Sequence, residues 1–112
     1  MSNSQLLGYL EETVLLLVML MDKDAYGFSV SEEYRRQTGK GISISAVHTV
    51  LTRLEKKGFI QSSMGGATED RGGRRKRIFS ATEDGKRLVA EIKSARQKLW
   101  DQIPGLAPAP KP

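Results

Sequence analysis

The chain has 112 residues, no cysteine and a formal net charge of +5, with 38% hydrophobic and 28% charged residues. This length suits one small domain, and the lack of cysteine excludes disulfides and thiolate metal sites. The longest apolar run, Val14–Met21, is far shorter than the roughly 20 residues of a membrane span, and acids rather than a basic segment precede it, so we expect a soluble cytoplasmic protein without a signal peptide.

The first two helices are predicted from apolar side chains that recur at helical spacing. The first runs from Ser4 to Met21, and from Val14 onward it is apolar on all sides. We therefore expect its own domain to cover one face and a partner chain to cover the other. The second helix is predicted over Tyr26–Thr38 and ends at Gly39. Its core-facing residues are expected to be Tyr26, Val30 and Tyr34.

A third helix is expected to begin near Ser43 or Ser45, either of which can cap it, and to end at about Lys57, before Gly58. Its apolar arc consists of Val47, Val50, Leu51 and Leu54, the expected core face. The opposite face is small, polar and basic, which suits contacts with base edges and phosphates. The residues predicted to contact DNA here are Ser43, Ser45, His48, Thr49, Thr52, Arg53 and Lys56.

Two strands are predicted next, Phe59–Met64 and Arg75–Ala81, with Phe59 and Ile78 pointing inward. The pairs Gly65-Gly66 and Gly72-Gly73 are expected to bracket the polar loop between them. This hairpin with its loop, called the wing below, contains the run RGGRRKR, whose cations suit phosphates or a narrow minor groove. The wing residues predicted to contact DNA are Arg71, Arg74, Arg75, Lys76 and Arg77.

Charge is distributed unevenly along the chain. Residues 35–77 hold eleven Lys and Arg against three acids, whereas residues 1–34 hold one Lys against six acids. A basic block of this kind indicates a polyanionic partner, although a solvated surface or a loop that keeps the chain soluble is the simpler alternative. RNA or a membrane surface fits less well, because neither a base-stacking aromatic sheet nor an amphipathic basic helix is predicted.

The last helix is predicted to begin at Thr82, with Glu83 and Asp84 complementing the helix dipole in its first turn. Its apolar residues recur at spacings of four, three and four, as in a helix that pairs with its twin. The predicted dimerisation residues are Leu10, Val14, Leu88, Ile92, Ala95, Leu99 and Ile103. The expected domains are a DNA-binding domain at 1–81, a dimerisation helix at 82–104 and a disordered proline-rich tail at 105–112.

Few residues suggest a small-molecule or metal site. Trp100, the only tryptophan, could stack on an aromatic ligand between subunits, although plain interface packing is the more common role. His48 is the only histidine and has no cysteine or carboxylate cluster around it in the sequence, so no metal is expected. No nucleophile elbow, zinc-protease motif or phosphate-binding loop is present. The sequence therefore predicts neither an enzyme nor a cofactor.

Helices two and three, joined by the turn at 39–44, predict a helix-turn-helix followed by a wing, in the order α-α-α-β-β-α. At this point the chain resembles the PadR family of winged helix-turn-helix transcriptional regulators. The resemblance rests on AYGFSV at Ala25–Val30, SISAVHTVLTRLEKKGFI at Ser43–Ile60 and TEDRGGRRKRIFSATEDG at Thr68–Gly85. His48 departs from the family's usual Tyr, which puts the preferred DNA site in doubt rather than DNA binding itself.

The resemblance, closest to the small subgroup with a short C-terminal region, implies a homodimer joined through the first and last helices. It also implies a repressor that a small, often aromatic effector releases from DNA. The residues themselves favour a dimer that reads an inverted repeat in duplex DNA. Two other classes remain open, a non-specific architectural DNA-binding protein and a winged-helix adaptor for another protein.

Overall fold

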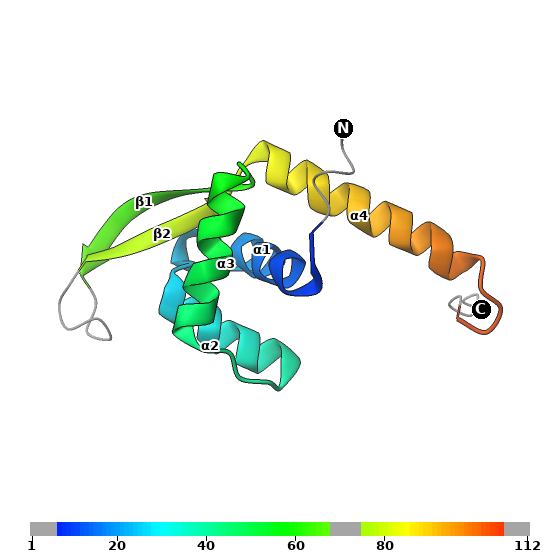
Figure 1. Cartoon of the computed structure of the whole chain (residues 1–112), viewed down its shortest axis with the longest axis horizontal. Coiled ribbons are helices and arrows are strands. Elements are labelled where there is room, and N and C mark those ends of the chain that lie inside the picture. The colour runs from blue at the N-terminus through cyan, green and yellow to red at the C-terminus, as the bar shows by residue number, and fades with distance from the viewer. Residues whose placement is uncertain (1–6, 68–74, 107–112) are drawn as a thin grey trace.

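The computed structural model describes residues 7–67 and 75–106. Three helices are followed by a two-stranded hairpin and a long last helix, which confirms the predicted α-α-α-β-β-α winged helix-turn-helix (Figure 1). A short 3-10 turn, η2, follows the first helix. The elements are α1 Tyr9–Met21, η2 Asp22–Asp24, α2 Gly27–Thr38, α3 Ile44–Lys56, β1 Ile60–Ala67, β2 Arg75–Ala81 and α4 Glu83–Asp101.

Helix α1 is the central element of the core. Val14, Leu15 and Val18 are fully buried, as the apolar sequence predicts. The helix begins later than expected, because Gly8 is its N-cap and its backbone N–H donates to Glu11 Oε1 at 3.3 Å. Leu7 therefore precedes the helix, and the expected start at Ser4 lies outside the described residues.

Helices α2 and α3 form the helix-turn-helix within one residue of the predicted bounds, with Tyr26, expected as a core-facing helical residue, as the half-buried N-cap of α2. Gly39 adopts the left-handed conformation, with φ of 75°, and ends α2. Of the two candidate caps of α3, Ser43 fills the role, since its Oγ accepts from the Ala46 N–H at 3.0 Å. The buried Ser31 hydroxyl donates to the carbonyl of Ile42 at 2.9 Å and fixes the turn against α2.

The hairpin differs from its prediction in two respects. Gly65 and Gly66 lie within β1, which continues to Ala67, so they do not begin the loop; a bulge between Met64 and Ala67 accommodates them. The inward residue of β2 is Phe79, 4% exposed, and not Ile78, which lies half-buried on the other face. Phe79 points inward because its backbone N–H donates to the Ala25 carbonyl at 2.8 Å, which fixes the orientation of β2.

Helix α4 is anchored at its start and free at its end. The Thr82 hydroxyl caps it by accepting from the Gly85 N–H, and donates to the Gly58 carbonyl at 2.7 Å. Further along, Arg96 pairs with Glu12 of α1 at 3.2 Å. The helix then extends beyond the other elements, opposite the hairpin (Figure 1). Residues 107–112 of the predicted tail lie outside the described residues, and Leu106 closes a turn onto Ile103.

Candidate nucleic-acid interface

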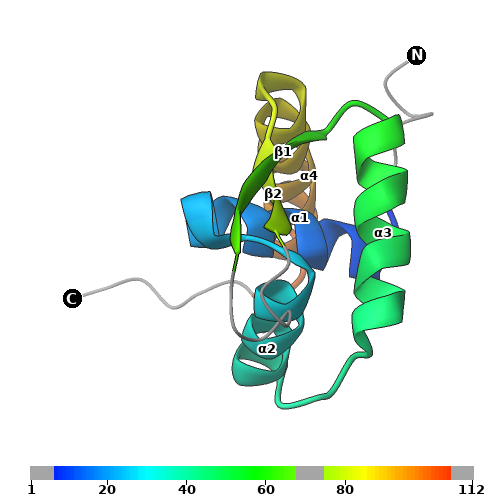
Figure 2. The same cartoon turned by 90° about the vertical axis from the view of Figure 1, so that its left-hand side faces the viewer.

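The outer face of α3 is uncovered along its whole length. Figure 2 shows α3 along one edge of the molecule, with the other elements to one side of it. Its core residues Val47, Leu51 and Leu54 are fully buried, so the orientation of the helix is fixed. The polar residues predicted to contact DNA are all exposed, namely Ser43, Ser45, His48, Thr49, Thr52, Arg53 and Lys56.

Two of these hydroxyls already make hydrogen bonds within the helix. Ser43 Oγ is the helix cap, and Thr49 Oγ1 donates to the carbonyl of Ser45 at 3.1 Å. The single hydroxyl proton of Thr49 is therefore used, and its oxygen keeps acceptor capacity. No hydrogen bond joins the Thr52 or Lys56 side chain to another residue in the described part of the chain. Those two side chains can turn toward a ligand without breaking a bond.

His48 lies at the edge of α3 that faces the start of α2. A Cβ added to Gly27 would lie 2.6 Å from His48 Nε2, so the imidazole rests directly on the Gly27 backbone. This close approach explains why a residue without a side chain begins α2. His48 stays exposed, and its ring occupies the border between the recognition face and α2.

Three wing cations are described, and each has a partner within the chain. Arg75 Nε donates to the Gly65 carbonyl at 3.1 Å, across the hairpin. Lys76 Nζ lies 4.4 Å from the centroid of the Tyr26 ring, a cation–π contact with the N-cap of α2. Arg77 Nη1 donates to Ser62 Oγ at 3.0 Å. The predicted contacts Arg71 and Arg74 lie outside the described residues.

A cleft separates α3 from the wing. It has a volume of about 550 Å³ and is lined by His48, Thr52 and Glu55 of α3 and by Met64, Arg77 and Phe79 of the hairpin, with Gly27 at its end. His48, Thr52 and Glu55 are spaced four and three residues apart and so form one stripe of the helix. The polar face of α3 and the basic wing are thus two separate surfaces, and the cleft lies between them.

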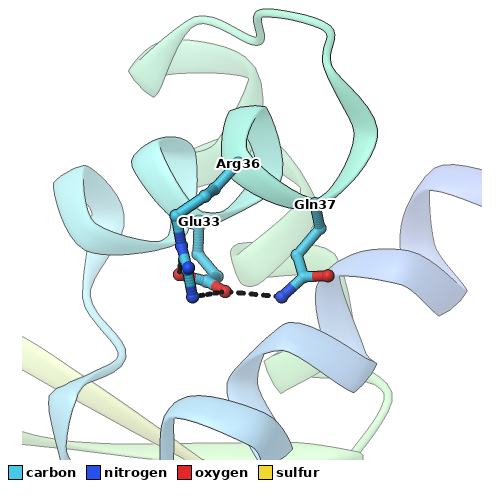
Figure 3. Close-up of polar contacts among 3 residues, drawn as sticks. All are labelled: Glu33, Arg36 and Gln37. Atoms are coloured by element: carbon cyan, nitrogen blue, oxygen red, sulfur yellow. Dashed lines mark hydrogen bonds and ion pairs between the residues drawn. The ribbon is translucent and has the colours of Figure 1, made fainter.

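Helix α2 carries a compact polar cluster of its own, in which Arg36 is exposed and Glu33 is largely covered (Figure 3). Glu33 accepts from Arg36 at 2.9 and 3.1 Å and from Gln37 at 2.8 Å. These hydrogen bonds, the one from Arg36 foremost, hold the pKa of Glu33 below its usual value, and they raise the pKa of Arg36. Arg36 is therefore paired with an acid, unlike the cations of α3.

The predicted dimerisation residues fall into three classes of exposure. Val14 and Leu88 are buried in the core of the single chain, so their side chains are not available to a partner. Leu10 and Ile92 are half-buried, and Ala95, Leu99 and Ile103 are exposed. Exposed apolar side chains outside this set include Leu16 and Leu20 on α1, at 45% and 61%. Trp100 on α4, for which the sequence favoured interface packing over ligand stacking, is 51% exposed.

A groove of about 420 Å³ runs between α1 and α4. Its apolar lining includes Leu16, Met19, Val89 and Trp100, and its charged lining consists of Glu12, Lys86, Lys93 and Arg96. Within residues 7–67 and 75–106, no group of three His, Cys, Asp or Glu is placed to hold a metal ion. Across the same ranges, every helix is too short or too polar to cross a membrane.

Comparison with known proteins finds a match over residues 16–91 to the transcriptional regulator PadR-like family. An uncharacterised protein of Lysinibacillus sphaericus is 32% identical over 98 residues, which span 86% of this chain and 82% of that protein. A transcriptional regulator of Clostridium thermocellum has 25% identity and a TM-score of 0.63, covering 84% of this chain and 87% of its own. A PadR-like transcriptional regulator of Bacillus cereus shares the fold, with 18% identity, a TM-score of 0.66 and coverage of 80% and 82%.

Proposed function

The chain belongs to the PadR-like family of transcriptional regulators, and from this premise we propose that it is a sequence-specific repressor that binds an inverted repeat as a homodimer. Membership assigns the chain to DNA-binding transcription regulation and not to catalysis. The observation that carries the finer proposal is the exposed polar face of α3 beside a basic wing. An architectural protein would need the charge but not a shaped recognition face.

In this proposal, α3 reads bases in the major groove and the wing grips the backbone. Ser45, His48, Thr49 and Thr52 have side chains short enough for base edges, while Arg53 and Lys56 suit phosphates. The wing supplies Arg75, Lys76 and Arg77, together with Arg71 and Arg74. Bonds within the chain hold the described wing cations in place before DNA arrives, which reduces the entropy lost on binding.

Dimerisation would occur through α4 and the uncovered side of α1. Leu99, Trp100 and Ile103 are 63%, 51% and 45% exposed near the end of α4, where no described element of the chain covers them. Neighbouring exposed apolar side chains of this size mark interaction surfaces. Residues 1–81 would then form the DNA-binding domain and residues 82–104 the dimerisation helix. Two recognition helices about 34 Å apart would read the two halves of a palindrome.

The groove between α1 and α4 is a candidate site for an effector. Its volume of about 420 Å³ lies within the range of small-molecule sites. Trp100 offers an aromatic face for stacking. The lining holds three cations against one acid, Glu12, which pairs with Arg96, and this balance favours a planar aromatic ligand with negative charge. Because the groove also adjoins the proposed dimer surface, a bound effector would change the spacing of the two recognition helices and release DNA.

The test is an affinity selection of fragmented genomic DNA from the source organism on the purified chain at about 150 mM salt, near physiological ionic strength, followed by sequencing. A specific dimer predicts a few enriched fragments that share an inverted repeat. Uniform recovery of all fragments would contradict the proposal and indicate an architectural protein. Recovery of none, with and without aromatic additives, would indicate a protein partner instead.

The wing's part is tested with the double variant Arg74→Ala/Arg75→Ala. Loss of two phosphate contacts in each chain, and so four in the dimer, should weaken binding to all duplexes and reduce the slope of log affinity against log salt by about 4. The matched control is Arg35→Ala/Arg36→Ala on α2, which removes the same charge away from the wing. An unchanged slope in the wing variant, or an equal change in the control, would remove these arginines from the interface.

A further inference from the structure

A chain of two hydrogen bonds joins the recognition helix to the wing. Ser62 Oγ donates to Glu55 Oε2 at 2.7 Å, and Arg77 Nη1 donates to Ser62 Oγ at 3.0 Å. Glu55 lies in the last turn of α3, Ser62 in β1 and Arg77 in β2. The bridge therefore joins α3 to both strands of the wing across the cleft.

The hairpin presents this bridge toward α3 because of its register. Ser62 pairs with Phe79, and Met64 pairs with Arg77, so Ser62 and Arg77 are diagonal neighbours on one face. Phe79, on that same face, is buried in the core and fixes which way the face points. Arg77 is thereby held over the cleft, whereas Lys76, the next residue back, contacts Tyr26 on the other side.

The Ser62 hydroxyl suits the middle position because it has one proton to donate and lone pairs to accept. It donates that proton to the carboxylate and accepts from the guanidinium, so each bond involves a charged partner. A bridge of this kind is directional and holds both neighbours in one geometry. Removing its centre breaks the link between the Glu55 and Arg77 side chains without changing any charge.

The charge of Glu55 is otherwise unfavourable where it stands. It is the sole acid in the sequence of α3, between the cations Arg53 and Lys56. A carboxylate on a surface that approaches phosphates lowers affinity for every duplex. The presence of an acid at position 55 is therefore better explained by its hydrogen bond to Ser62 within the protein than by a contact with DNA.

We propose that Glu55 is a positioning residue, which acts through Ser62 and Arg77 to fix the angle of the wing against the recognition helix. This inference rests on the proposed function, because a fixed angle matters only when α3 and the wing must engage one DNA site together. The bridge favours the duplex whose groove spacing fits that angle. It thus contributes to discrimination among sequences more than to affinity.

The binding test compares Glu55→Ala with Glu32→Ala, a control on α2. Glu32 is exposed and makes no hydrogen bond or ion pair with another described residue, so the control removes the same charge without a bridge. The probes are the most enriched fragment from the genomic selection and a shuffled duplex of equal length. Glu55→Ala should lower the affinity ratio of the two probes by about three- to tenfold, the effect of one solvent-exposed hydrogen bond. Its binding to the shuffled duplex should be unchanged or tighter.

Ser62 supplies the second arm of the test. Ser62→Ala should lower the ratio as Glu55→Ala does, the double variant should lower it no further, and Ser62→Thr, which keeps a hydroxyl, should behave as the unmodified chain. Ratios that stay constant in Ser62→Ala and Glu55→Ala, or that fall equally in Glu32→Ala, would overturn the bridge. If the unmodified chain itself fails to discriminate, the proposed function fails before any variant is compared.

A measurement without DNA tests the geometry directly. Because the chain has no cysteine, Thr49→Cys and Ser63→Cys place two spin labels on α3 and on β1. Distances between the labels should be more broadly distributed after Glu55→Ala or Ser62→Ala than in the labelled parent, with no change after Glu32→Ala. Equal distributions in all four proteins would show that the bridge does not hold the wing.

Discussion

Helices α3 and α4 both carry a regular apolar stripe, but the chain covers the two stripes to different extents. In α3 the stripe Val47, Val50, Leu51 and Leu54 is buried throughout. In α4 Leu88 and Val89 are buried, while Leu99 and Trp100 are more than half exposed. The same periodicity thus has two outcomes, a core face that α1 and α2 complete and a face left open at its far end. The core stripe is thus completed within the chain, whereas the end of α4 leaves apolar side chains exposed.

Substitutions in the buried stripe of α3 should have the largest effects on stability. Leu51 is fully buried in α3, so Leu51→Ala should lower the free energy of unfolding by about 3 kcal/mol through lost burial and a residual cavity. Denaturant unfolding at several protein concentrations measures the loss. Because Leu51 is buried within one chain, the loss in free energy of unfolding should be the same at each protein concentration. A loss below about 1 kcal/mol would mean that the core is not packed as described.

The next largest effect on stability is expected where the start of α4 packs against the winged part. Gly85 packs so closely on Phe59 that an added Cβ would overlap the Phe59 carbonyl oxygen, a backbone atom that cannot move aside. Gly85→Ala should therefore lower the free energy of unfolding by about 2 kcal/mol. Gly66→Ala is the matched control, because nothing lies within 4 Å of its added Cβ. Similar thermal shifts in the two variants would contradict this account of the junction.

The winged part also illustrates which features of the fold could be predicted from the sequence. The bounds of α3, its buried stripe and the cap at Thr82 were predictable, because helical spacing and capping residues are local signals. The phase of β2 was not, since Ile78 and Phe79 both suit an inward position and a hydrogen bond to Ala25, far away in sequence, decides between them. Glycine pairs usually indicate a loop, so the extension of β1 through Gly65 and Gly66 was missed as well.

The candidate site was predictable to a similar degree. The polar face of α3 follows from the helical wheel, and the wing cations follow from composition. The link between them was not predictable, because Glu55, Ser62 and Arg77 come from three elements and meet through a register that the sequence does not specify. Tertiary contact likewise separated Val14 and Leu88, which are buried within the chain, from Leu99, which is exposed.

Substitutions at the exposed end of α4 should change self-association rather than the stability of the fold. Trp100→Ala should weaken self-association by about tenfold or more, the effect of truncating a central aromatic at an interface. Its thermal unfolding at low protein concentration should match that of the unmodified chain. Sedimentation equilibrium measures the association, with Phe28→Ala, an exposed aromatic on α2, as control. Unchanged association in Trp100→Ala would place the dimer surface elsewhere.

The smallest expected effect concerns the polar cluster of α2. Because the pKa of Glu33 is lowered in the folded chain, ionised Glu33 stabilises the fold above the unfolded pKa. That contribution is lost as the pH falls through the folded pKa. Arg36→Ala removes the foremost cause, so the pKa of Glu33 should rise toward its usual value. An NMR titration of the Glu33 carboxyl carbon measures it, and an identical midpoint in the variant would contradict the assignment.

We expect two copies of this chain to read one DNA site through two recognition helices. The most direct test is the stoichiometry and footprint of the chain on the fragment most enriched from genomic DNA. We predict two chains per duplex and two protected half-sites about 34 Å apart, related by inversion. A single chain on a site without a repeat, or protection that continues to grow along the duplex, would contradict the account.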